Sequence, residues 1–190
     1  MQTIRIKDIT DVIAGYTFRT AIKNDTDGNM QVIQAKDIQH DNQINCEDLP
    51  KVSIDNLRSS ATLKQNDVLL SCRGVFRAGV LTEDLKNAIG SASLYILRIK
   101  SEKVLPEYLS IYLNSNAGQK QIQQVLSGST IKTILRRELA ELPVILPSIQ
   151  KQKQIIEIQR NWKKREELLN RKITLNNNIA NGAIDYLLTQ

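Results

Sequence analysis

From residue 147 to residue 188 the chain reads PSIQKQKQIIEIQRNWKKREELLNRKITLNNNIANGAIDYLL, and this stretch decides the fold. Pro147 ends the preceding structure, and Ser148 is a candidate helix N-cap. No proline follows before residue 188, and Gly182 is the one strong helix breaker. Apolar residues recur at steps of mostly three, four or seven, which is typical of one face of a helix. They are Ile155, Ile158, Trp162, Leu169, Ile173, Ile179 or Ala180, Ala183 or Ile184, and Leu187.

A helix of about 40 residues would be roughly 60 Å long at 1.5 Å per residue. Because that exceeds the size of the domain beside it, another helix must cover much of the apolar stripe. We therefore predict a coiled coil that dimerises or docks a partner. Polar residues interrupt the stripe near Arg165 and Glu166 and at Asn176, positions that can set register and partner number. The residues leave open a helix that folds back on its own domain, with a break at 176–178 or at Gly182.

The residues before this helix mix short strands with turns and long polar loops, the places where recognition tends to occur. Strands are predicted at 4–6, 68–71, 92–99 and 144–146, loops at 23–30 and 41–48, and helices from Pro106 and over 116–126. We therefore expect an α+β fold. A small strand-rich domain with a few helices covers residues 1–147, and one long C-terminal coiled-coil helix covers residues 148–190.

The composition is that of a folded protein, with 41% hydrophobic and 24% charged residues. The opening MQTIRIKDIT lacks the apolar run of a secretory signal, and no stretch approaches the ~20 apolar residues that span a bilayer. We expect a cytoplasmic protein with no membrane partner. The net charge is +6: residues 1–149 contribute 18 − 16 = +2 and residues 150–190 contribute 8 − 4 = +4. The nearly neutral first part would need a local basic patch to bind a polyanion.

Residues suited to catalysis or cofactor binding are few. Cys46, Cys72 and His40 are the only cysteines and histidine, too few for a zinc site, and any catalytic triad would have to use His40. Neither G-x-x-x-x-G-K-[ST] nor G-x-G-x-x-G occurs. The scattered carboxylates are interpreted as solvated surface acids, although a metal-dependent nuclease stays open. They include Asp67, Glu83, Asp84 and Glu102. We expect no catalysis, no metal and no cofactor.

Five segments are informative through their order along the chain. They are GYTFR at 15–19, LKQNDVLLS at 63–71 with Arg73-Gly74, LPEYL at 105–109 with YLNS at 112–115, GSTI at 128–131 with LPV at 142–144, and LPSIQKQKQI at 146–155. Together they resemble the specificity subunits of type I restriction–modification systems over nearly the whole chain. Asn66 departs from the family's usual glycine, which adjusts only the turn.

A typical member of that family carries two target-recognition domains, each followed by such a helix, and this chain resembles one such unit. The resemblance implies that the domain reads a short sequence of double-stranded DNA, mainly through the major groove. It implies a homodimer whose antiparallel helices hold two domains up to about 50 Å apart, over a bipartite inverted-repeat site. It also implies docked modification (methyltransferase) subunits, with the restriction subunit as a further candidate partner, and no catalysis by this chain.

The candidate DNA-binding residues lie on loops. Arg73, Gly74 and Arg77 follow the predicted strand 68–71, and arginine can pair bidentately with guanine. The other candidates are Arg19, Lys36, Ser129, Thr130, Lys132 and Arg136. The candidate dimer contacts are Ile155, Ile158, Trp162, Leu169, Ile173, Ile179, Ile184 and Leu187. Two other classes stay open: a coiled-coil adaptor that binds protein and not DNA, and the recognition half of a nuclease or methyltransferase.

Overall fold

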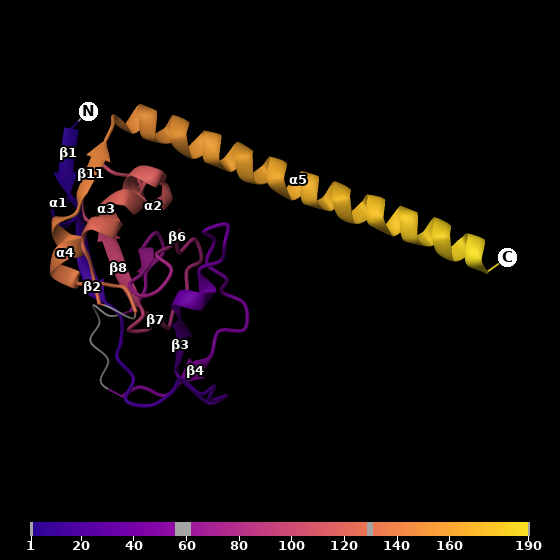
Figure 1. Ribbon diagram of the computed structural model, residues 1–190. Helices are drawn as coiled ribbons and strands as arrows, with labels where there is room; N and C mark the ends of the chain where they lie inside the picture. Colours follow the sequence, from indigo (N-terminus) through magenta and orange to yellow (C-terminus); the bar gives the residue numbers. More distant parts are fainter. Residues whose placement is uncertain (1, 56–61, 129–130, 190) are drawn as a thin grey trace. The chain divides into compact units, whose positions relative to one another are not determined.

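A computed structural model describes residues 2–55, 62–128 and 131–189 (Figure 1). The chain divides into two compact units, Met1–Lys153 and Gln154–Gln190. The strands are β1 Gln2–Arg5, β2 Thr10–Ala14, β3 Met30–Ile33, β4 Lys51–Val52, β5 Val68–Ser71, β6 Ala78–Val80, β7 Ala88–Gly90, β8 Leu94–Ile99, β9 Leu126–Ser127, β10 Thr133–Ile134 and β11 Pro143–Leu146. The helices are α1 Ile6–Ile9, the 3₁₀ turn η1 Ala35–Asp37, α2 Pro106–Asn114, α3 Asn116–Gln124, α4 Arg136–Glu141 and α5 Ile149–Leu188.

The first unit contains a four-stranded antiparallel sheet in the order β2-β8-β5-β6. All four residues of β5 are buried between its neighbours, which explains the uninterrupted apolar run Val68–Leu70. Helix α2 begins with Pro106 and packs on β5 and β6 through a buried face that includes Leu109 and Leu113. The predictions of a strand at 68–71 and of a helix from Pro106 are confirmed.

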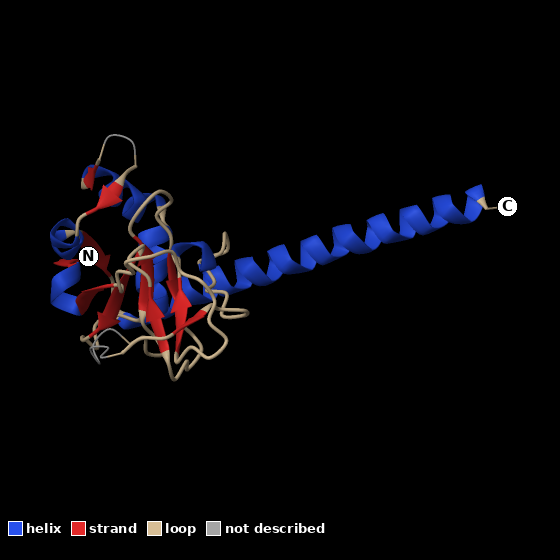
Figure 2. Ribbon diagram, turned by 90° about the horizontal axis from the view of Figure 1, so that it is seen from below, coloured by secondary structure: helices blue, strands red, loops and turns tan. Residues whose placement is uncertain are grey.

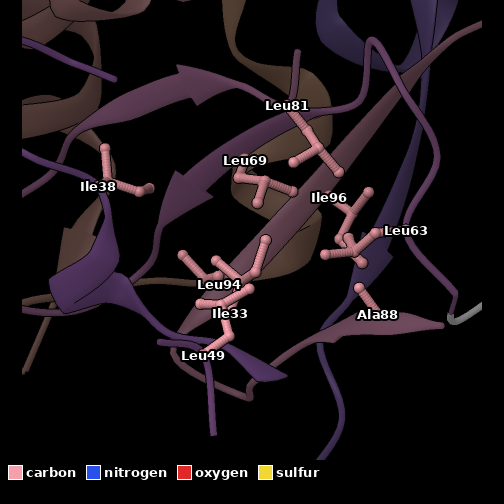
Figure 3. Packing of buried hydrophobic residues seen from close by; sticks show 9 residues of the cluster. All are labelled: Ile33, Ile38, Leu49, Leu63, Leu69, Leu81, Ala88, Leu94 and Ile96. Atoms are coloured by element: carbon pink, nitrogen blue, oxygen red, sulfur yellow. The ribbon is translucent and has the colours of Figure 1, made fainter. Parts of the chain in front are cut away.

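A second sheet, in the order β4-β3-β7, combines an antiparallel pair with the parallel pair β3 and β7. Side chains from both sheets meet in one core: Ile33 and Ala88 come from the second sheet, and Leu69 and Ile96 from the first (Figure 3). Extended loops, tan in Figure 2, connect the strands, and the predicted loops 23–30 and 41–48 are confirmed apart from Met30, which begins β3. The α+β fold class is therefore confirmed.

The ends of the first unit pair with each other, because β1 runs antiparallel to β11 with Gln2 opposite Leu146 (Figure 1). The predicted strand 4–6 is wrong at Ile6, which begins α1 and is fully buried. The Ile6 N–H donates to the Leu142 carbonyl at 3.1 Å. The predicted helix 116–126 ends at Gln124, because Leu126 pairs with Ile134 in β9–β10. The first difference arises from a contact with a residue distant in sequence, and the second from a short hairpin.

Helix α5 runs from Ile149 to Leu188 without interruption, so the break considered at 176–178 or Gly182 is not present. Its first turn belongs to the first unit and is anchored by the fully buried Gln152. The Gln152 amide accepts from the Leu105 N–H at 2.9 Å and donates to the Lys103 and Pro147 carbonyls at 2.8 and 2.9 Å. Within the described parts of the chain, no helix combines the length and hydropathy that crossing a membrane requires.

Candidate nucleic-acid interface

The loop of residues 72–77 between β5 and β6 is fixed by hydrogen bonds at its base. The Ser71 hydroxyl donates to the Val75 carbonyl and accepts from the Arg77 N–H at 2.9 Å, which closes the turn from inside. Phe76 is buried, and its carbonyl accepts from the Gln119 side-chain amide at 3.0 Å. The exposed side chains of this loop are therefore attached to a backbone that hydrogen bonds hold in one conformation.

A second hairpin, β9–β10, lies against this loop. Arg73 forms an isolated antiparallel bridge with Thr133. The Gly74 N–H donates to the Lys132 carbonyl at 3.2 Å, and the Ile134 N–H donates to the Cys72 carbonyl at 3.0 Å. Main-chain hydrogen bonds, which do not depend on side-chain identity, thus join residues 72–74 of the loop to residues 132–134 of the hairpin. Residues 72–75 and 131–134 are called the joined tips below.

This pairing brings together three of the predicted DNA-binding residues, Arg73, Gly74 and Lys132, and a fourth, Arg136, begins α4 two residues after the paired Ile134. All four are exposed. Ser129 and Thr130 fall outside the described residues. The Tyr95 hydroxyl reaches the same place and donates to the Ile134 carbonyl at 2.9 Å. Burial raises the pKa of Tyr95, while the nearby positive charges of Arg136 and Arg73 act in the opposite direction. The two guanidinium groups therefore lie close enough to one phenol to affect it electrostatically.

Arg77 lies at the base of the same loop, but it is half-buried and has a partner. Its Nη2 lies 2.9 Å from Nδ1 of His40. Because a guanidinium only donates, the imidazole must accept at Nδ1 and carry its proton on Nε2. Arg77 is therefore less available to an external ligand than Arg73 is.

The two remaining candidates, Arg19 and Lys36, are exposed on other segments. Arg19 follows Phe18, whose ring meets that of Tyr16 edge-on at 4.9 Å between centroids. Lys36 lies in η1, next to Ala35, whose N–H donates to the Ser93 hydroxyl at 3.2 Å. The Ser93 carbonyl accepts from the Cys72 N–H at 2.9 Å. Ser93 therefore links η1 to the loop 72–77 by hydrogen bonds to both.

Two exposed apolar residues at the joined tips were missed by sequence reasoning, which searched the loops for basic and small polar residues only. Val75 and Ile131 are each 63% exposed. Val75 follows Gly74 and Ile131 precedes Lys132, so the two flank the hydrogen bond that links the tips. An apolar residue in a loop after a buried strand was the signal available for Val75.

Asp67 corrects one interpretation, because it is not a solvated surface acid. Its side chain is 2% exposed and receives two bonds from Arg98, from Nε to Oδ1 at 2.9 Å and from Nη2 to Oδ2 at 2.7 Å. The hydrogen bond to Asp67 raises the pKa of Arg98 against the effect of burial. Asp67 therefore holds the turn before β5 to β8.

On α5, the predicted stripe is exposed in the single chain except at Ile155, which is half-buried. The exposed members are Ile158, Trp162, Leu169, Ile173, Ile179, Ile184 and Leu187, each more than half exposed. The apolar surface is wider than predicted from the middle of α5 onward, where Leu168, Leu175, Tyr186 and Leu188 are also exposed.

A sequence model of the type I restriction modification DNA specificity domain matches residues 1–177. The chain belongs to this family. Among relatives of this specificity domain, the type I restriction enzyme EcoBI specificity subunit of Escherichia coli is 29% identical over 138 residues. That alignment covers 70% of this chain and 28% of the relative.

Solved structures show the same specificity-domain fold. The S subunit of a type I restriction-modification system from M. genitalium has a TM-score of 0.60 at 16% identity, over 92% of this chain and 42% of that one. The HsdS subunit from Thermoanaerobacter tengcongensis has a TM-score of 0.62 at 17% identity, over 90% and 39%. A chain from a study of assembly and conformational transition in the type I R-M system has a TM-score of 0.67 at 19% identity, over 90% and 40%. This specificity-domain chain thus spans about two fifths of these structures and less of the EcoBI subunit.

Proposed function

We propose that this chain is a DNA-reading specificity subunit whose first unit contacts double-stranded DNA through the joined tips of the loop 72–77 and the hairpin β9–β10. The observation that carries the proposal is the main-chain pairing that brings the exposed Arg73 and Lys132 together, with Arg73 and Arg136 both near Tyr95. Residues 1–149 carry a net charge of 18 − 16 = +2, so a local basic cluster matters more than the overall charge.

The arrangement suits sequence reading because the backbone is fixed before any ligand binds. Ser71, Gln119 and the β9–β10 hairpin hold the loop, so little conformational freedom remains to be lost on binding. Arg73 is exposed on this framework, and a guanidinium group can contact guanine O6 and N7 bidentately. Lys132 and Arg136 suit phosphate contacts, which position the protein without reading sequence.

Selection from a random duplex library, followed by binding isotherms on the selected site, tests this proposal. Arg73→Ala is expected to weaken binding to the selected site by about 1–3 kcal/mol and to relax preference at one base pair. Lys132→Ala is expected to weaken binding to all sequences and to reduce the slope of log K against log [salt] by about 1. Lys86→Ala, which removes one exposed positive charge on another loop, is the matched control.

The selection also separates the proposal from the adaptor class. A library with no enriched sequence, together with binding that does not respond to salt, would refute DNA reading and favour a protein-binding module. Cleavage of the selected duplex by the chain with magnesium would refute the non-catalytic role that we propose for it.

We further propose that two copies pair through antiparallel α5 helices and so read a bipartite site with inverted halves. The exposed apolar side chains of α5 support this, since covering one Leu or Ile stabilises an interface by about 1.5–3 kcal/mol. The extra apolar width near the C-terminus supports a second occupant, for which we propose the modification subunits that carry methyl transfer.

Sedimentation of two variants tests the pairing. Leu169→Glu places a charge in the stripe and is expected to yield monomers at micromolar concentration. Asn170→Glu places the same charge one residue away, outside the stripe, and is expected to leave the dimer intact. A wild-type chain that sediments as a monomer with and without the modification partner would refute the pairing.

A further inference from the structure

Resting on the proposed DNA-reading function, we propose that Val75 and Ile131 read thymine by packing against its C5-methyl group in the major groove. The two side chains project from the joined tips, and each is 63% exposed. Each lies one residue from the hydrogen bond between Gly74 and Lys132, so one backbone contact sets the position of both.

The conformation of the loop 72–77 keeps the Val75 side chain outside the core. The next residue, Phe76, is buried at 6% exposure, and the Ser71 hydroxyl is bonded to the Val75 carbonyl. With the carbonyl held inward and the neighbouring ring in the core, the Val75 side chain remains at the tip. It is β-branched and therefore stiff at χ1, so it presents its methyl groups in a narrow range of directions.

The charges beside these two residues favour a polyanionic ligand. Arg73 and Lys132 are their near neighbours in the chain, and Arg136 follows on the next element. Cationic side chains next to exposed apolar ones are complementary to a groove edged by phosphates. Within the major groove of DNA, the thymine methyl is the apolar group that distinguishes one base from the others.

The test uses the full-length chain and duplexes that differ by single methyl groups. A site is first selected from a random-sequence duplex library, and each thymine in it is then replaced by uracil, which removes the methyl and keeps every hydrogen-bonding group. At one or more positions this replacement is expected to weaken wild-type binding by about three- to tenfold, the effect of losing one buried methyl with its packing.

The variant chains assign the contact. Val75→Ala is expected to bind the thymine duplex about as weakly as wild type binds the uracil duplex, and to show no further loss at that position. Ile131→Ala is expected to do the same at a second position. Ile145→Ala, which shortens an exposed apolar side chain on β11, is the control and is expected to keep the full thymine preference.

Three results would overturn the inference while leaving DNA reading in place: a selected half-site without an A·T pair, equal affinity for thymine and uracil at every position, or an unchanged thymine preference in both variants. Failure of any sequence to be enriched would instead overturn the proposed function, and this inference with it.

Discussion

Replacing Asp67 by Asn tests whether the buried ion pair stabilises the framework under the loop 72–77. The carboxylate is 2% exposed and accepts from Nε and Nη2 of Arg98 and from the Lys64 N–H at 2.8 Å. The asparagine amide keeps the size of the side chain, but its NH₂ group cannot accept a hydrogen bond from any of these donors. Removing one partner of a buried pair costs about 3–5 kcal/mol. Because Arg98 is 18% exposed and can be partly hydrated, we expect a loss of about 2–4 kcal/mol.

Urea and thermal unfolding measure this loss. At about 2–4 °C per kcal/mol for a chain of this size, the melting temperature is expected to fall by about 5–15 °C. Asp84→Asn, which neutralises an exposed carboxylate, is the matched control and is expected to change stability by less than about 0.5 kcal/mol. In the double variant with Arg98→Gln, the loss is expected to be smaller than the sum of the single losses, since no charge is left unpaired. Equal stability of the Asp67→Asn and Asp84→Asn variants would refute the reasoning.

Three further predictions concern other positions. Gln152→Leu leaves the Leu105 N–H and the Lys103 carbonyl without their partner and is expected to lower the free energy of unfolding by about 2–4 kcal/mol. Gln150→Leu, at an exposed position, is the control and is not expected to lower it. Equal unfolding curves of the two variants would contradict the anchoring role of Gln152. Asn66 has φ +71°, in the left-handed region that favours glycine. In urea titrations Asn66→Gly is expected to be neutral or stabilising, and Asn66→Ala is expected to lower the free energy of unfolding by about 1 kcal/mol. The reverse order of stability would contradict the role of the turn. Burial, with Glu83 acting in the same direction, raises the pKa of Cys46 to about 11. Its alkylation at pH 8 is therefore expected to be about a hundredfold slower than that of a free cysteine and to accelerate towards pH 11, as mass spectrometry of the labelled chain would show.

Elements that are decided locally could be predicted from the sequence. The buried run Val68–Leu70, Pro106 at a helix start and the long apolar stripe after Pro147 each appear at the expected residues. Very short elements, which depend on their pairing or packing partners, could not. The two-residue strand Leu126–Ser127 exists only because it pairs with Thr133–Ile134, and the four residues of α1 are too few to show a helical period.

The candidate site was partly predictable for the same reason. A guanidinium group after a strand is a visible signal, and the segments that carry Arg73 and Lys132 do pair. That Arg77 is engaged with His40 depends on a contact between positions 37 residues apart, which no local pattern shows. The burial of Asp67 was missed because a polar turn cluster looks the same whether its carboxylate faces water or an arginine on another strand.

The joined tips separate the groups that fix the backbone from the groups that can meet a ligand. Main-chain atoms of Cys72, Gly74 and Lys132, together with the buried Ser71 and Phe76, hold the two loops in place. Meanwhile Arg73 and Val75 project to solvent and take no part in the core. Substitution of Val75 therefore removes no core packing, whereas substitution at Ser71 or Phe76 does. A surface built in this way can change the ligand that it prefers while the fold beneath it stays the same, which is the physical requirement for the sequence-discriminating role that we propose.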